Sequence, residues 1–96
     1  MGQEIPEFDW DDSNLYHLAR HNVAPEEAEQ AILDPNGVLL EIYTDNGEQR
    51  TKALGMTRSG RILTVVFSFR GEAIRPITAY VAATRLQKNY LERRGI

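Results

Sequence analysis

The feature that most constrains this chain is a set of four short segments in its second half, in which apolar and polar residues alternate. The segments cover residues 38–43, 50–57, 62–69 and 73–81. Alternation with a period of two is typical of strands, because successive side chains point to opposite faces. The connecting sequences Asp45-Asn46-Gly47, Arg58-Ser59-Gly60 and Arg70-Gly71-Glu72 are hairpin signals. Three successive hairpins predict a four-stranded antiparallel meander sheet.

Helical patterns flank the four segments. Residues 13–21 follow N-cap residues and show the 3.6-residue period of a helix, and Pro25 suits the first turn of a second helix that ends at 34–37. Residues 83–94 predict a C-terminal helix, and residues 5–10 a short edge strand. The apolar residues that mark these three helices are Leu15, Leu18, Ala19, Ala28, Ala31, Ile32, Leu86, Tyr90 and Leu91. The fold class expected is therefore α+β.

Length and composition bound the class of protein. The 96 residues suit one domain, over 1–96, with a single modest core. There is no cysteine, so neither disulfides nor thiolate chemistry is expected. No apolar run approaches the roughly 20 residues of a membrane span, and residues 1–12 do not read as a signal peptide. We expect a soluble cytoplasmic protein.

The charge is distributed unevenly along the chain. Residues 1–49 hold twelve carboxylates against one arginine, a net charge of −11, whereas residues 50–96 hold ten cations against two carboxylates, a net charge of +8. Such asymmetry points to a polyanionic partner. The alternative is that the two halves neutralise each other in the folded protein.

Strand alternation sorts the basic half into two faces. In 62–69, one face carries Leu63, Val65, Phe67 and Phe69, which we expect to lie against the helices. Four cations are then predicted to line a cationic surface suited to phosphate, namely Arg50, Lys52, Arg70 and Arg75. The alternative is a solvated sheet face whose arginines only oppose aggregation.

Other kinds of site are poorly supported. His17 and His21 have a spacing that can hold zinc, but the intervening residues lack the glutamate of the metalloprotease motif. We therefore expect no metal site, and interpret His17 as an ordinary helix-surface or packing residue. His21 lies near a predicted helix C-terminus, where a cation is favoured.

Several ordered segments resemble the BrnT-type toxins. The early ones are Phe8-Asp9-Trp10-Asp11, Leu18-Ala19-Arg20-His21-Asn22-Val23, Glu26-Glu27-Ala28 and Asp34-Pro35. The later ones are Gly47-Glu48, Arg50, Leu54-Gly55-Met56-Thr57, residues 60–67, Arg70-Gly71, residues 74–80, Arg85 and Tyr90. The resemblance spans residues 7–92.

The resemblance implies a RelE-like fold and a toxin of a type II toxin–antitoxin system. It implies a metal-independent endoribonuclease that needs no cofactor, attacks RNA through the substrate's 2′-OH and stops translation. It also implies a ribbon-helix-helix antitoxin as partner, with operator DNA reached only through that antitoxin.

The resemblance also suggests which residues act. The expected catalytic residues are Arg75, Arg50, Arg70, Tyr80 and His21, with Arg75 gripping the scissile phosphate. The expected RNA-binding residues are Lys52, Arg58 and Arg85. Met56 and Tyr80 stand where the family often has arginine, which leaves open a second hypothesis: a weakly active or inactive toxin-fold module that serves as corepressor of its antitoxin. An unrelated structural or assembly domain is a third.

Overall fold

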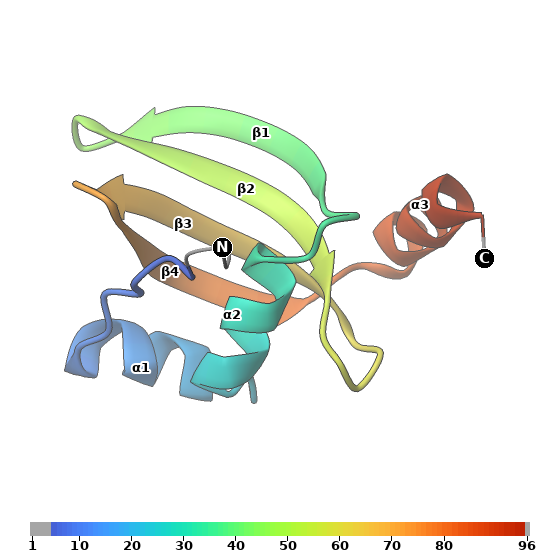
Figure 1. Ribbon diagram of the computed structural model, residues 1–96, viewed down its shortest axis with the longest axis horizontal. Helices are drawn as coiled ribbons and strands as arrows, with labels where there is room; N and C mark the ends of the chain where they lie inside the picture. The colour runs from blue at the N-terminus through green and yellow to red at the C-terminus, as the bar shows by residue number, and fades with distance from the viewer. Residues whose placement is uncertain (1–4, 96) are drawn as a thin grey trace.

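A computed structural model of the chain describes residues 5–95 and shows a curved four-stranded sheet with two helices along one face and the C-terminal helix at one end (Figure 1). The elements in chain order are α1 (Asp12–Ala19), α2 (Pro25–Ile32), β1 (Val38–Asp45), β2 (Glu48–Met56), β3 (Ile62–Arg70), β4 (Ala73–Val81) and α3 (Thr84–Arg94). The sheet order is β1-β2-β3-β4, with every neighbouring pair antiparallel. The predicted α+β meander is confirmed.

The β1–β2 turn shows why the hairpins form where the sequence places them. Asp45 pairs with Glu48, so the turn has two central residues, Asn46 and Gly47. Their φ angles are 51° and 77°. Positive φ at both positions makes a turn whose twist matches that of the strands, and asparagine followed by glycine adopts it readily.

The predicted N-terminal edge strand is wrong in extent. Only Phe8 forms a bridge, parallel to Ile74 of β4. Two backbone hydrogen bonds hold it: the Asp9 N–H donates to the Ile74 carbonyl (2.8 Å), and the Ile74 N–H donates to the Glu7 carbonyl (2.9 Å). This bridge matters for the site because it brings the acidic segment beside β4.

The α1 helix begins and ends slightly earlier than predicted, and its buried face is different. Asp11 is the N-cap, and its carboxylate accepts from the backbone N–H groups of Ser13 and Asn14. Leu15, predicted to belong to the apolar stripe, is 37% exposed, whereas Asn14 and Leu18 are buried. The buried face is therefore displaced by one residue, and a polar side chain lies within it.

The main core lies between α1, α2 and one face of the sheet. Its buried members are Leu18, Val23, Ala28, Ala31, Leu63, Val65 and Ala79. Gly55 permits this packing, because a Cβ built on it would lie 1.9 Å from the carbonyl oxygen of Ala31 in α2. Phe69, predicted to join the core, is 63% exposed, because it lies at the far end of β3.

The opposite face of the sheet packs against α3 at one end only. This second cluster comprises Val38, Leu54, Ile62, Ala82 and Tyr90, with Leu86 and Leu91 beside it, as predicted for the C-terminal helix. The Tyr90 hydroxyl donates to the Asp34 carboxylate, which also accepts from the Met56 backbone N–H (2.8 Å). The rest of this face is free to form a site.

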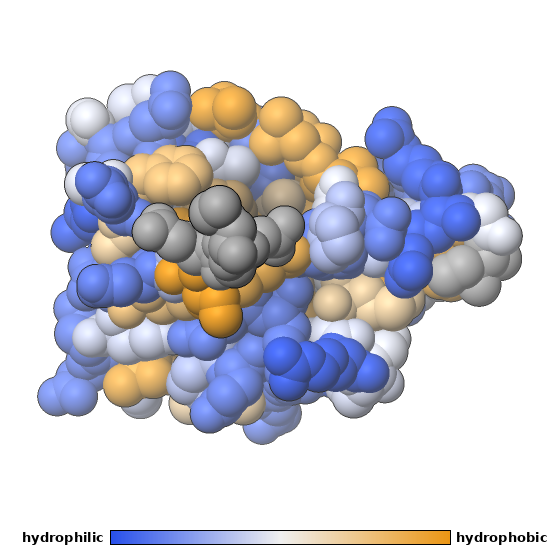
Figure 2. All heavy atoms as spheres, viewed as in Figure 1, coloured by the Kyte–Doolittle hydropathy of each residue, from blue (hydrophilic) through white to orange (hydrophobic). Residues whose placement is uncertain are grey.

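Exposed apolar side chains gather along β1, at the outer edge of the sheet. Figure 2 shows them as orange atoms at the top of the view, where Figure 1 places that strand. The large exposed side chains of β1 are Leu39 (60%) and Ile42 (54%). In the part of the chain that the structure describes, no helix is both long and apolar enough to cross a membrane.

Candidate RNA-cleavage site

A β-bulge decides which face Arg75 occupies. Val66 pairs with Thr78 and Phe67 pairs with Pro76, so Ile77 has no partner in β3. Unbroken alternation would place Arg75 on the face of Ala79, against the helices. The extra residue instead sets Arg75 opposite Ser68, on the other face of the sheet.

The same face carries the other arginines of the predicted trio. Ser68 and Arg70 alternate along β3, and Arg50 and Lys52 alternate along β2, where Lys52 pairs with Val66. Arg50, Arg70 and Arg75, contributed by three different strands, line one cavity of about 470 Å³. That volume falls within the range of roughly 300–1,000 Å³ typical of ligand sites.

The α1 helix supplies the remaining wall of the cavity. The side chains that line it besides the arginines are Ser13, Asn14 and His17 of α1 and Ile77 and Thr78 of β4. Asn14 fixes α1 against β4: its side-chain amide donates to the carbonyls of Asp9 and Pro76, both at 2.9 Å. Its side-chain oxygen accepts from the Asp11 N–H at 2.8 Å. Asn14 can be buried because its side-chain amide and its side-chain oxygen both have hydrogen-bond partners.

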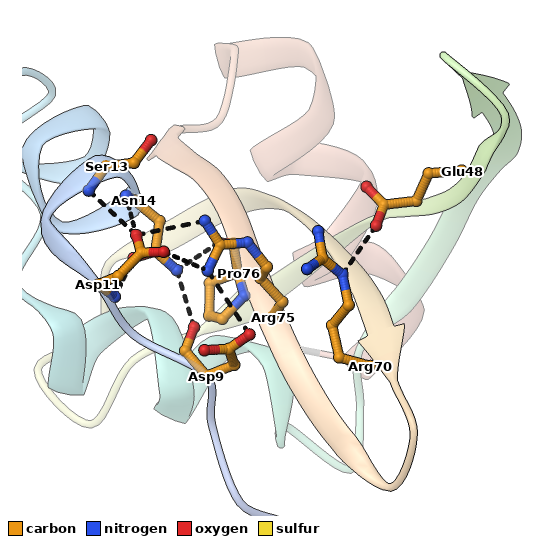
Figure 3. Close-up of polar contacts among 8 residues, drawn as sticks. All are labelled: Asp9, Asp11, Ser13, Asn14, Glu48, Arg70, Arg75 and Pro76. Atoms are coloured by element: carbon orange, nitrogen blue, oxygen red, sulfur yellow. Dashed lines mark hydrogen bonds and ion pairs between the residues drawn. The ribbon is translucent and has the colours of Figure 1, made fainter.

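Each arginine of the cavity is paired with a carboxylate from the acidic half of the chain. Arg75 contacts Asp11 (3.1 Å) and Asp9 (3.6 Å), as Figure 3 shows. The partner of Arg70 is Glu48 (2.9 Å). These carboxylates lie at the surface; the side chains of Asp11 and Glu48 are 54% and 27% exposed.

Arg50 shares in the same network. It contacts Asp45 at 2.9 Å and Glu48 at 3.4 Å, so Glu48 lies between two arginines. Exposed ion pairs of this kind contribute little to stability. Loss of these pairs should therefore cost little folding free energy.

The arginines hold these carboxylates in the charged form. The hydrogen bond from Arg75 lowers the pKa of Asp11, with help from the backbone N–H of Asn14. Burial raises the pKa of Glu48, but the hydrogen bonds and charges of Arg70 and Arg50 outweigh it, so the net change is downward. Both carboxylates consequently stay ionised at neutral pH, and both are weak proton acceptors.

The site face also holds two buried hydroxyls. Thr64 and Ser68 are each 1% exposed, and in the described part of the chain neither hydroxyl oxygen has a hydrogen-bond partner. Both lie on the arginine-bearing face of β3, with Ser68 directly opposite Arg75. The prediction that 64, 66 and 68 face away from the helices is confirmed.

The other predicted residues divide into two groups. Tyr80 lies on the same face, opposite Thr64, and its ring centroid is 5.8 Å from that of His21. Arg58 lies in the β2–β3 turn and lines a different cavity, beside α2, while Arg85 is on α3. The β2–β3 turn and α3 lie at the end of the sheet away from the β1–β2 hairpin (Figure 1), and Arg50 is near that hairpin.

Five residues that line the cavity were not predicted as site residues, namely Ser13, Asn14, His17, Ile77 and Thr78. Asn14 and His17 are three positions apart, which places them on one face of α1. The signal available in the sequence was the shared helical face of 13, 14, 17 and 21. Among residues 5–95, no three His, Cys, Asp or Glu side chains gather as a metal site would require.

Comparison with known protein families identifies the kind of protein. A family model, described as the ribonuclease toxin BrnT of type II toxin–antitoxin systems, matches residues 10–85. The chain belongs to the BrnT family. The matched segment of this BrnT chain includes all the residues that line the cavity. A search of curated proteins found no match.

Proposed function

We propose that this chain is the toxin of a type II toxin–antitoxin system, and that it cleaves RNA at the arginine cavity without a metal ion. The observation that carries the proposal is the convergence of Arg50, Arg70 and Arg75 from three strands on one cavity. Guanidinium groups stay charged at any working pH and present paired donors that match phosphate oxygens. Membership of a ribonuclease toxin family supports the same conclusion.

The reaction is attack of the substrate's own 2′-OH on the adjacent phosphate. The pentacovalent state carries more negative charge than the ground state, so positioned cations stabilise it preferentially. Arg75 is the proposed contact of the scissile phosphate, because it lines the cavity together with Arg50 and Arg70 and its side chain is the least exposed of the three (13%). Arg50 and Arg70 complete the charge compensation.

The residues around the cavity extend the RNA contact. Tyr80 offers an aromatic face for base stacking or a hydroxyl for acid catalysis, and His21 beside it is a candidate for proton transfer. Lys52, on the arginine face, meets a neighbouring phosphate. Arg58 and Arg85 bind RNA further from the cleaved linkage.

The biological setting follows from the same proposal. The toxin acts on RNA in the cytoplasm and stops translation, and a ribbon-helix-helix antitoxin binds it and carries it to operator DNA. The fold is then of the RelE-like kind. Type II systems by definition pair the toxin with a protein antitoxin, so the family match supports the presence of such a partner.

The test combines purified protein with a fluorescent single-stranded RNA in the presence of EDTA. Wild-type protein should cleave it, and Arg75→Ala should lower kcat by about 10²–10³-fold, the usual effect of losing one electrostatic donor. Arg75→Lys keeps the positive charge but loses the paired N–H donors of the guanidinium group, so it should recover only part of the rate. Cleavage that EDTA abolishes would contradict the proposal.

A second candidate function is favoured by the occupied state of the arginines. Because every cavity arginine already has a carboxylate partner, a catalytically weak module that serves as corepressor of its antitoxin fits the geometry too. Induced expression separates the two. Growth arrest that the antitoxin relieves and Arg75→Ala abolishes supports the ribonuclease, whereas an inert wild type supports the corepressor.

A further inference from the structure

We propose that His17 is the general base of this reaction, the group that takes the proton from the attacking 2′-OH. The inference rests on the proposed ribonuclease function. It adds a proton acceptor, which the arginines cannot supply. Arginines stabilise charge, but they do not accept protons in proteins. A second kind of side chain is therefore needed at the cavity.

The position of His17 is fixed by the elements around it. It follows Asn14 by three residues, so the two share one face of α1. Asn14 binds the backbone of β4 through Pro76 at 2.9 Å, and this anchor sets α1 beside the strand that carries Arg75. One turn further on, the exposed His17 side chain lines the same cavity as the three arginines.

Elimination among the lining side chains selects the same residue. Ser13 and Thr78 carry hydroxyls, which are not bases near neutral pH, and Ile77 is apolar. Asn14 is neutral, and its polar atoms are bound to backbone groups. Of the lining residues, only His17 offers a neutral nitrogen lone pair.

The carboxylates near the cavity are worse bases than an imidazole. Arg75 lowers the pKa of Asp11, and the pKa of Glu48 is likewise below its ordinary value. A general base works best when its proton affinity suits the working pH, which a carboxylate held by arginine does not. His21, the other histidine, lies against the Tyr80 ring and is not among the residues that line the cavity.

The proposed step balances without a further reactant. The neutral imidazole of His17 accepts the 2′-OH proton as the 2′ oxygen forms a bond to phosphorus. The bond from phosphorus to the 5′ oxygen breaks, and that oxygen takes a proton from water. The products are a 2′,3′-cyclic phosphate and a 5′-OH, and the imidazolium then returns its proton to the solvent.

Several charged or titratable groups line the cavity with His17, pair with its arginines, or neighbour His17 along α1. They are Arg50 of β2, Arg70 of β3, Arg75 of β4, the carboxylates of Asp9, Asp11, Asp12 and Glu48, the Tyr16 ring (centroid 6.5 Å away) and His21 on the next turn. The test must therefore separate His17 from each neighbour that titrates.

The experiment measures single-turnover cleavage of an RNA oligonucleotide against pH for wild type, His17→Gln, His21→Gln and Tyr16→Phe. In parallel, a 2′-O-methyl oligonucleotide, which has no 2′-OH to react, reports binding. His17→Gln should lower the rate by about 10²–10⁴-fold, the usual contribution of a general base. It should bind the 2′-O-methyl probe as wild type does and lose the rise of rate with pH. Tyr16→Phe should match wild type.

A substrate with a 5′-bridging sulfur at the cleaved linkage distinguishes base from acid. Sulfur leaves without needing a proton, so the defect of His17→Gln should persist if His17 acts on the 2′-OH. Rescue by the sulfur substrate would overturn the assignment by making His17 the acid. Cleavage by His17→Gln at the wild-type rate, or loss of the pH dependence in His21→Gln alone, would also overturn it while leaving the ribonuclease intact. A wild type that cleaves nothing would end both proposals.

Discussion

Salt dependence of RNA binding is the most direct test of the arginine cavity. Each phosphate neutralised on a single strand contributes about 0.7 to the slope of log affinity against log salt. Arg50, Arg70, Arg75 and Lys52 share one face, so these four cations should contribute about −2.8 to the slope at most. Between 50 and 200 mM salt, the loss of their contacts alone should lower affinity by up to roughly 50-fold.

The carboxylates of the site refine this estimate. When RNA displaces Asp11 or Glu48 from its arginine, the freed carboxylate attracts cations, which reduces the net release of ions. The observed slope should therefore be somewhat shallower than the limit. Arg75→Ala should lower the limit to about −2.1, which corresponds to a loss of roughly 20-fold over the same range.

The assay is fluorescence anisotropy of a labelled 2′-O-methyl oligonucleotide, which is bound but not cleaved. Lys88→Ala is the matched control, because it removes the same charge from an exposed position on α3. Its slope should equal that of wild type. A flat titration of wild type, or an equal change of slope in Arg75→Ala and Lys88→Ala, would refute the cavity as the phosphate site.

Three further substitutions each test one position. Asp11→Asn should raise RNA affinity and steepen the salt slope, because asparagine still caps α1 but has no negative charge to compete with RNA for Arg75. The control Asp12→Asn should change neither the affinity nor the slope. The pKa of Asp11 is lowered in the folded state. The stability that its carboxylate contributes is therefore present above the unfolded-state pKa and is lost as pH falls through the folded-state pKa. In an acid titration followed by circular dichroism, Asp11→Asn should lose less stability than wild type. Gly55→Ala should lower the free energy of unfolding in urea by about 1–3 kcal/mol or more, because the new Cβ would overlap Ala31 of α2. The control Gly71→Ala, whose Cβ meets nothing within 4 Å, should cost only its backbone strain. Equal losses in the two variants would contradict the packing argument. Tyr90→Phe should cost about 1.5–3 kcal/mol, because it removes a hydrogen bond to the Asp34 carboxylate; an unchanged urea midpoint would show that this contact does not hold α3.

The sheet was predictable because its turns depend on local chemistry. Asn46-Gly47 specifies the first hairpin wherever it lies between alternating segments, and tertiary packing did not override it. The inward face of α3 was predictable for a similar reason, since Leu86, Tyr90 and Leu91 follow one helical stripe.

The errors arose where tertiary context decides. Phe69 fits the apolar face of β3, but α1 and α2 do not extend that far along the strand. Leu15 was predicted to be a core residue because it recurs with Leu18 and Ala19 at helical spacing, whereas Asn14 is buried because its side chain binds the backbone carbonyls of Asp9 and Pro76. His17 was interpreted as a helix-surface or packing residue, and it is exposed; its position in the cavity depends on α1 lying beside β4, which no local signal in the sequence shows.

The bulge at Ile77 could not be predicted, although the site depends on it. Strict alternation places Arg75 with Ala79, and the sequence from 73 to 81 contains no glycine to mark an irregular position. Convergence of the arginines was thus a correct prediction that alternation along β4 did not support. The extra residue, Ile77, explains the convergence, because it turns Arg75 toward the face that carries Arg50 and Arg70.

The uneven charge of the chain has two consequences in the folded protein, namely ion pairs between its two halves and a cavity lined by arginines. Each ion pair found among residues 5–95 links a carboxylate of the acidic half to an arginine of the basic half, so the halves do neutralise each other in part. Three of these four arginines, Arg50, Arg70 and Arg75, line the cavity, and their carboxylate partners come from the N-terminal segment and the β1–β2 hairpin. An anion that enters must compete with these carboxylates, which favours a multivalent polyanion over a single free phosphate, because several contacts must be replaced together. RNA satisfies that requirement, and so does an acidic segment of a protein partner. Under the proposed function, the carboxylates therefore favour binding of a polyanion over binding of a single free phosphate.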